Sequence, residues 1–325
     1  LPATLGADAP YENMGTIQTK GWELAIDYRH TFKNGLHFGV TASVADDKTE
    51  VTKWTYNTKI PSYGAAGWWD KSAYKEGMVL GDIWGLQFDR FLTEDDFNAD
   101  GSLKAGLPDQ TKVFPAGYQF APGDVLYKDL DNNGEIVKQT NTNDKGDLSV
   151  IGNALPRLQF GLNLDAAWKG FDISMFFQGV AKRKLWAAGN QVLPGFTTGE
   201  PFYKGAEDYW TPENTDAFYP RPMDYKQSAS GNYSVNDRYL LNMAYLRLKT
   251  FTVGYSLPKV WLSKFKVQGL RVYFTGENLF TIDGVKPAID PEIGIRTASG
   301  KSDQRNFGRS YPYQKTVSFG IQLSL

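Results

Sequence analysis

Apolar and polar residues alternate along several stretches of this 325-residue chain, and this period of two restricts its fold more than any other feature. Every even position from Leu158 to Trp168 is apolar, whereas Gln159, Asn163 and Asp165 lie between them. The same pattern recurs in the stretches 22–30, 171–178 and 317–325. Successive side chains of a strand point to opposite faces, so these stretches are predicted to be strands with one apolar and one polar face.

The connections between these strands alternate between very short and very long. Asn34-Gly35 and Lys169-Gly170 each join two alternating stretches directly, which is typical of tight hairpins. A modest link, 256–269, joins the stretches 240–255 and 270–281. The remaining connections are long and lose the alternation: 52–156, 181–238 and 283–314. Short turns at one end and long loops at the other are the pattern of a transmembrane antiparallel β-barrel, whose short turns are periplasmic and whose long loops are extracellular.

The composition agrees with a β-rich chain and excludes several classes of protein. With 35 basic and 36 acidic residues, the net charge of −1 gives no reason to expect nucleic acid as a partner. The absence of cysteine excludes disulfides and thiolate metal sites. No run approaches the roughly 18 apolar residues of a transmembrane helix, and the mean hydropathy is −0.42. Barrel strands look hydrophilic on average because they alternate, so these values remain compatible with a barrel.

One strand changes phase along its length. Leu246 and Leu248 share a face, but Phe251, Val253 and Tyr255 follow in the opposite phase. Either a bulge near Lys249–Thr250 or a strand that leaves the membrane produces such a slip, and the sequence leaves both open.

Seven strands are recognisable, which is too few for a barrel with such large loops and is an odd number. A complete small bacterial barrel has an even number of strands. The strands are therefore expected to be part of a larger wall. The strand-like segment GDIWGLQF, 81–88, indicates that the first long loop holds a further pair. The first residues, LPATLGADAP, carry no targeting signal, which indicates a mature chain or a fragment.

The stretch KDLDNNGEI, Lys128–Ile136, has the spacing of the first half of a calcium loop, and we call it the aspartate loop. Asp129, Asp131 and Asn133 are predicted to supply side-chain oxygens to a metal, and Glu135 its backbone carbonyl. Gly134 falls at the sharp turn. Calcium is favoured over zinc because every candidate ligand is oxygen.

The second half of that calcium loop is missing. Position twelve, where a bidentate Glu is expected, is Thr140. Asp144 or Asp147 is the candidate to complete the metal shell by folding back. The alternative is a polar turn on a surface loop without metal.

Aromatic residues in the long loops are candidates for sugar stacking or for a partner interface, because rings favour both. They are Trp68, Trp69, Trp84, Trp186, Tyr203, Tyr209 and Trp210. For any single one of them, packing between loops is the more common role. Near the strand ends, an aromatic girdle at the membrane surface is expected of Trp22, Trp168, Phe171 and Tyr255.

No enzyme is expected. The two histidines, His30 and His37, flank the Asn34-Gly35 turn, and no third metal ligand accompanies them. The chain has no GxSxG elbow and no phosphate-binding glycine loop, and nothing singles out a pair of carboxylates.

An ordered series of stretches resembles the C-terminal half of the barrel in SusC/RagA-type TonB-dependent outer-membrane transporters. The series runs NMGTIQTKGWELAIDYR, GMVLGDIWG, GDVLYKDLDNNGEI, VIGNALPRLQFGLNLDAAWKGFDISMFFQG, YWTPENTDAFYPR, AYLRLKTFTVGYSLP, LRVYFTGENLFT, DPE and SYPYQKTVSFGIQLSL. It covers nearly the whole chain. The resemblance implies that residues 1–325 are the C-terminal strands of a 22-stranded barrel, and that the plug domain and the N-terminal strands are absent from this chain.

The same resemblance implies partners and a substrate. These are a SusD-like surface lipoprotein, the TonB complex acting through the missing part, and an oligosaccharide or peptide that the transporter imports across the bacterial outer membrane. The loops 181–238 and 283–314 are the expected lipoprotein interface. The polar strand residues Gln159, Asn163, Asp165, Asp172, Gln178 and Glu277 are expected to face a wet lumen. The alternative function is that of a surface-anchored or soluble β-rich glycan-binding protein, in which the apolar residues of 158–164 are buried in a sandwich instead of facing lipid.

Overall fold

A computed structural model describes residue 13 and residues 15–55, 75–138, 145–187, 189–196, 201–223, 231–286, 289–292 and 313–325. The long strands are β1 (Gly15–Thr31), β2 (His37–Trp54), β7 (Arg157–Trp168), β8 (Phe171–Lys182), β11 (Tyr245–Ser256), β12 (Gly269–Asp283) and β13 (Thr316–Ser324). The short strands are β3 (Asp82–Gly85), β4 (Phe88–Phe91), β5 (Val125–Tyr127), β6 (Ser149–Asn153), β9 (Lys184–Leu185) and β10 (Leu241–Asn242). The helices are η2 (Glu94–Asp96), α2 (Lys259–Leu262) and η3 (Ser263–Phe265). No helix among the described residues is long and apolar enough to cross a membrane.

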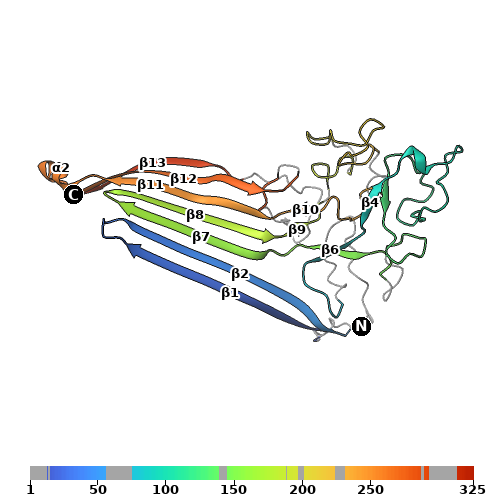
Figure 1. The fold of residues 1–325 in the computed structure, drawn as a ribbon, viewed down its shortest axis with the longest axis horizontal. Helices are drawn as coiled ribbons and strands as arrows, with labels where there is room; N and C mark the ends of the chain where they lie inside the picture. Colours follow the sequence, from blue (N-terminus) through green and yellow to red (C-terminus); the bar gives the residue numbers. More distant parts are fainter. Residues whose placement is uncertain are drawn as a thin grey trace, which may run out of the picture.

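The seven long strands form one antiparallel sheet, in the order β1-β2-β7-β8-β11-β12-β13, and we call this sheet the wall. These are the seven strands that the alternation predicts. The turns at Gly35 and Gly170, with φ of 80° and 89°, lie at one end of the wall together with α2 and the C-terminus (Figure 1). The described parts of the long loops gather at the other end (Figure 1). The predicted separation of short turns from long loops is therefore confirmed.

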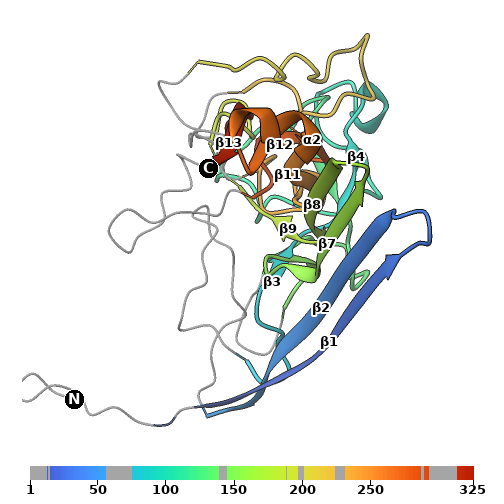
Figure 2. The same ribbon diagram turned by 90° about the vertical axis from the view of Figure 1, so that its left-hand side faces the viewer.

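The wall is curved but open. Viewed from its short-turn end, the strands follow one another round an arc from β1 to β13 (Figure 2). Within the described part of the chain, β1 pairs only with β2 and β13 pairs only with β12, so the arc does not close into a barrel. The unpaired backbone N–H and C=O groups along such long edge strands can form hydrogen bonds with further strands.

The wall is a single layer. All 17 residues of β1 are exposed on both faces. The apolar row that includes Phe160 and Leu162 is half-buried by neighbours in the sheet and belongs to neither of the buried hydrophobic clusters. Large side chains of the same face are widely exposed, such as Ile26 at 55% and Phe319 at 82%. A sandwich core would bury this face, so the described residues do not support the alternative of a β-sandwich.

A β-bulge explains the change of phase in β11. The register shifts between Leu248 and Thr250 in the pairing with β8 and also in that with β12. Leu248 lies opposite Phe177 and Phe251 lies opposite Met175, both of which belong to the apolar row of β8. The extra residue, Lys249, thus returns the rest of the strand to the same apolar face, and the bulge is confirmed.

The first long loop does hold short strands, but they do not extend the wall. The segment 81–88 forms β3 and the start of β4, which pair with β6 and β5 in separate two-stranded sheets. The expectation that it adds a pair of strands to the barrel is not met. β9 and β10 pair in a third such sheet, at the end of the wall where the long loops gather (Figure 1).

Two buried hydrophobic clusters hold the loops together. The first loop core joins all three long loops and consists of Ile83, Leu185, Trp186, Ala187, Val192, Leu193, Phe196, Tyr219, Tyr233, Tyr239, Leu241, Met243, Val285 and Ile289. The second loop core joins the first two and consists of Leu86, Phe91, Val113, Phe114, Val125, Tyr127, Ile136, Leu148, Trp210 and Ala217. The described parts of the loops therefore form a packed layer at one end of the wall, and we call it the loop layer.

Candidate functional site

The polar face of the wall carries ion pairs that connect strands. Near the short-turn end, Asp172 of β8 pairs with Arg271 of β12 at 2.5 Å. His37 Nε2 lies 3.5 Å from Asp165. Charged side chains that pair across strands on one face, opposite an uncovered apolar face, give the arrangement expected of a wet lumen.

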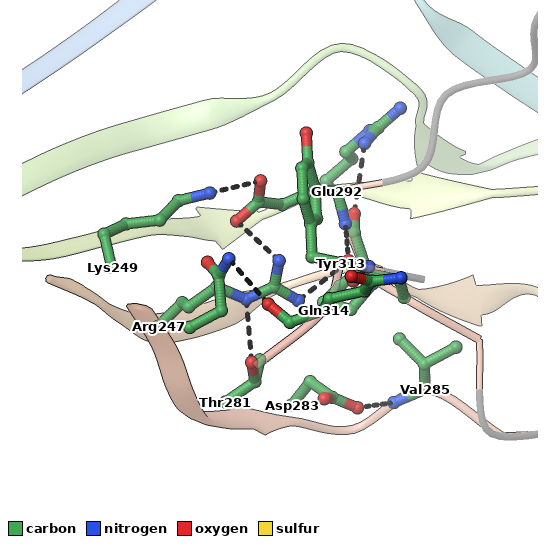
Figure 3. Close-up of polar contacts among 12 residues, drawn as sticks. Arg247, Lys249, Thr281, Asp283, Val285, Glu292, Tyr313 and Gln314 are labelled. Carbon is green, nitrogen blue, oxygen red and sulfur yellow. Dashed lines mark hydrogen bonds and ion pairs between the residues drawn. The ribbon is translucent and has the colours of Figure 1, made fainter. Parts of the chain in front are cut away.

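Where β11 meets the loop layer, Arg247 is the centre of a buried ionic cluster (Figure 3). Its Nη2 lies 2.8 Å from Asp290 Oδ1, and its Nε donates to Thr281 Oγ1 at 2.7 Å. Its Nη1 lies 3.1 Å from Glu292 Oε1, an ion pair without hydrogen-bond alignment. Only 4% of the Arg247 side chain is exposed. These contacts hold the described segment 289–292 of the third long loop against the polar face of the wall.

Lys249 and Tyr313 complete this cluster, which we call the loop anchor. Lys249 Nζ lies 2.6 Å from Glu292 Oε2. The Tyr313 ring covers both cations, with Lys249 Nζ 4.7 Å and Arg247 Cζ 5.2 Å from its centroid. Two cations therefore face two carboxylates, which satisfies the charge balance that a buried cluster requires. The bulge at Lys249 sets this second cation beside the first.

The aspartate loop folds around its own carboxylates. Asp129 accepts hydrogen bonds from the backbone N–H of Gly134 at 2.8 Å and of Asn133 at 3.3 Å. Asp131 accepts from the N–H of Asn133 at 3.1 Å and from its side-chain amide at 3.0 Å. The Gly134 N–H holds the pKa of Asp129 below its usual value, whereas desolvation raises the pKa of Asp131.

Asp147 joins Asp129 and Asp131. One ligand oxygen of each lies within 4.8 Å of the others. Asp147 is fully buried and is held in place by the backbone N–H groups of Leu130 and Val137, at 2.7 and 2.8 Å. Of the two acids expected to complete the metal shell, Asp147 is the one that the structure brings into place, while Asp144 and Thr140 lie outside the described residues.

The other two predicted ligands have different surroundings. Asn133 Oδ1 accepts a hydrogen bond from the Glu135 N–H at 2.7 Å. The Glu135 side chain forms an ion pair with Lys112, away from the three carboxylates. An all-oxygen set with three carboxylates fits the chemistry of calcium, with Asp129, Asp131 and Asp147 as the residues to hold it.

The aromatic candidates fall into two groups. Trp186 and Trp210 are buried at 1% and 7% exposure within the loop cores, and Trp84 packs against the second one. These three tryptophans therefore pack between loops, which is the more common role. Tyr203 and Tyr209 instead line a pocket in the second long loop. Trp68 and Trp69 lie outside the described residues.

Three of the four residues expected to form an aromatic girdle, Trp168, Phe171 and Tyr255, lie near the short-turn end of the wall. Trp168 and Phe171 are 43% and 59% exposed, and the Phe171 ring lies 4.5 Å from that of Tyr255. Trp22 differs, because β1 extends well beyond it and places it opposite Asp46 in the middle of the strand. The expectation that Trp22 marks a strand end is wrong.

The comparisons with known proteins agree with this architecture. The chain is homologous to SusC-type TonB-dependent receptors and to RagA structures. It is 26% identical to TonB-dependent receptor P3 of Formosa agariphila over 99% of this chain and 30% of that protein. It is 22% identical to TonB-dependent receptor SusC of Bacteroides thetaiotaomicron over 97% of this chain and 27% of that protein. The chain thus spans less than a third of the length of these relatives. No protein-family profile matches it.

Solved structures show the same fold. The RagAB peptide transporter superposes with a TM-score of 0.63 at 18% identity, covering 99% of this chain and 31% of the other. The RagAB peptide importer in its open-open state gives a TM-score of 0.64 at 17% identity, covering 100% and 30%. The wall and its loop layer therefore correspond to part of the RagA barrel.

Proposed function

We propose that this chain, as a homologue of SusC-type TonB-dependent receptors, is the C-terminal part of the barrel of a TonB-dependent transporter in the bacterial outer membrane. Residues 1–325 supply seven wall strands and the extracellular loop layer. The plug, the remaining strands of a 22-stranded barrel and the contact with the TonB complex belong to the part of the transporter outside this stretch.

One observation carries this proposal most strongly. The wall is a single-layer sheet with an uncovered apolar face, a charged opposite face and two edges that have no partner among the described strands. An exposed apolar face of this extent needs lipid or another protein against it. Further barrel strands would pair with β1 and β13, and lipid would cover the apolar face.

The face assignment is tested by single cysteines, because the 325 residues contain none. Met175 and Ser174 are neighbours on opposite faces of β8, so Met175→Cys and Ser174→Cys form a matched pair. In the complete transporter reconstituted into lipid nanodiscs, a water-soluble maleimide should label Ser174→Cys and spare Met175→Cys. Equal labelling of both positions would show that lipid does not cover the apolar face.

The substrate is proposed to be an oligosaccharide or a peptide, delivered with a SusD-like lipoprotein that covers the loop layer. The RagAB relatives, which are peptide transporters, support the peptide alternative. Uptake of radiolabelled peptides and of oligosaccharides by cells that carry the complete transporter, with and without a protonophore, distinguishes the two. Uptake that persists without the proton gradient would exclude TonB-driven transport.

We also propose that the aspartate loop binds calcium through Asp129, Asp131 and Asp147. Three carboxylates that lie close together repel one another, and a divalent cation relieves that repulsion. The role of the ion is structural, because the loop lies within the packed layer and not on the polar face of the wall.

A further inference from the structure

A pocket of about 540 Å³ opens within the second long loop. The described segments that line it (194–196, 201–223 and 231–233) lie at the end of the wall away from the short turns (Figure 1). Five aromatic rings line it: those of Phe202, Tyr203, Tyr209, Tyr219 and Tyr233. We call it the tyrosine pocket. Its volume is within the usual range for sites that bind small ligands.

The back of the tyrosine pocket is rigid. Tyr219 and Tyr233 are only 5% and 4% exposed and belong to the first loop core. The Tyr219 hydroxyl donates to the Val192 carbonyl at 3.0 Å, and the Tyr219 ring stacks on Tyr239 at 6.0 Å. Burial raises the pKa of Tyr219 to about 12, so its phenol is neutral at physiological pH. The pocket is therefore preformed and apolar at its back.

The mouth of the pocket exposes large apolar surface. Phe202 is 59% exposed and Tyr209 is 40% exposed. Large rings left open to water beside a concave surface favour a ligand that covers them.

The polarity of the lining restricts the chemistry of that ligand. Of the eleven lining residues, five carry rings, three are prolines and one is Ala206. Only Lys204 and Glu207 are charged, and their charges are opposite. A saccharide presents a hydroxyl on nearly every carbon, and buried hydroxyls without partners are costly. The lining therefore suits an apolar ring of the ligand, and it favours neither a positive nor a negative charge on that ligand.

We propose that the tyrosine pocket binds an extended peptide segment by receiving a proline or aromatic side chain between its rings. Aromatic-lined grooves recognise proline-rich segments because the extended backbone is already formed before binding. Exposed tyrosines provide contact area together with a hydroxyl for the peptide backbone. This site goes beyond the proposed transport function, because it lies in the loop layer and not on the polar face of the wall.

The test measures binding of the fluorescein-labelled peptide Ala-Pro-Trp-Pro-Ala to the complete purified transporter by fluorescence anisotropy. Saturable binding is expected, together with a loss of about tenfold or more in affinity for Tyr209→Ala. Tyr209→Phe should retain the affinity within about threefold because it keeps the ring. Leu155→Ala is the matched control, since Leu155 is a loop residue with 43% exposure that does not line the pocket.

A second variant tests the location without removing a ring. Ala206→Trp adds volume inside the pocket and should abolish binding, while the thermal unfolding of the transporter stays unchanged. Three outcomes would overturn the proposal: no saturation up to about 1 mM peptide, equal affinity in Tyr209→Ala and wild type, or displacement of the peptide by maltotriose. None of these outcomes bears on the wall, so failure here is distinct from failure of the transport proposal.

Discussion

Arg271 on β12 pairs with Asp172 on β8 across an intervening strand, with Nη2 lying 2.5 Å from Oδ2. The strand between them, β11, has Gly254 opposite Asp172. A side chain at that position would occupy the space of the guanidinium, since a Cβ built on Gly254 lies 2.7 Å from Arg271 Cζ. The glycine is what allows one arginine to connect three neighbouring strands on the polar face.

Gly254→Ala should therefore displace Arg271 from Asp172 while the wall still forms. The pair is about one-third exposed, so its loss should lower the free energy of unfolding by about 0.2–1 kcal/mol. Thermal unfolding of the complete transporter measures this change. Gly269→Ala is the matched control, because its Cβ would lie at an ordinary 3.6 Å from Ser324. If Gly254→Ala costs as much in an Asp172→Asn background, the displaced ion pair is not the cause.

Removing Arg247 from the loop anchor should have a much larger effect. Arg247→Met leaves Asp290, which is 5% exposed, without the cation that it pairs with among the described residues, and leaves Glu292 with Lys249 alone. Breaking a buried ion pair by removing one partner costs about 3–5 kcal/mol. Detachment of the segment 289–292 should appear as faster cleavage in limited proteolysis.

The control for the loop anchor is an exposed ion pair on the wall. Arg29→Met breaks the pair of Arg29 with Asp27, whose side chains are 64% and 53% exposed, and should cost about 0–1 kcal/mol. Adding Asp290→Asn to Arg247→Met should restore part of the protease resistance, because it removes the buried carboxylate charge that Arg247 balances. Cleavage that is equally fast in both Arg247 variants would argue against an uncompensated charge.

The wall could be predicted from the sequence because its two faces meet different surroundings along every strand. Apolar and polar residues such as Leu162 and Asn163 therefore alternate along each strand, and all seven strands and both tight turns can be recognised from short stretches of sequence. Even the bulge of β11 shows in the sequence as a change of phase after Leu248. What pairs with the edge strands β1 and β13 leaves no local trace in these residues.

The loop layer could not be predicted, because its order depends on contacts between residues far apart in the chain. The amide of Asn232 donates to Asp124, which lies 108 positions away, and Arg221 pairs with the same carboxylate at 2.7 Å. Arg247 lies 43 positions from Asp290. No period or motif marks such partners. The DPE tripeptide was visible as a family resemblance, yet nothing in it indicates a buried arginine opposite.

The aspartate loop should become protease-resistant in calcium at about 10⁻⁴–10⁻³ M, the range of weak extracellular sites. Asp129→Ala combined with Asp131→Ala should abolish that protection and leave the barrel folded. Asp100→Ala is the matched control, because Asp100 accepts the N–H of Ser102 at 2.9 Å in a similar turn outside the acidic cluster. If EDTA leaves the cleavage of the wild-type loop unchanged, the stretch is a polar turn without metal.

The ion pair of Asp96 with Arg90 predicts a local pH dependence in the first long loop. Two hydrogen bonds from Arg90, at 2.6 and 2.7 Å, lower the pKa of Asp96 to about 2. The unfolded value is about 3.9. The stabilisation is therefore complete above about pH 4 and is lost as the pH falls towards 2. After correction for the intrinsic exchange rate at each pH, the backbone amides of the segment 92–98 should exchange faster as the pH falls through that window. The increase should be smaller in Arg90→Gln.

Adjacent residues in the middle of β7 give the sharpest test of the wall. Leu162 lies opposite Ala42 and Phe177 on the apolar face, whereas Asn163 lies opposite Thr41 and Phe176 on the polar face. An arginine on the lipid face at the centre of the membrane costs about 2–4 kcal/mol, but a lumenal one is tolerated.

Leu162→Arg should accordingly lower the free energy of unfolding of the reconstituted transporter by about 2–4 kcal/mol, and Asn163→Arg by less than about 1 kcal/mol. Urea unfolding in lipid vesicles, followed by intrinsic tryptophan fluorescence, measures both variants against wild type. Because the two positions share strand, depth and introduced side chain, only the face differs. Equal destabilisation by the two arginines would mean that both faces are dry, and the assignment of a wet lumen to the charged face would then be wrong.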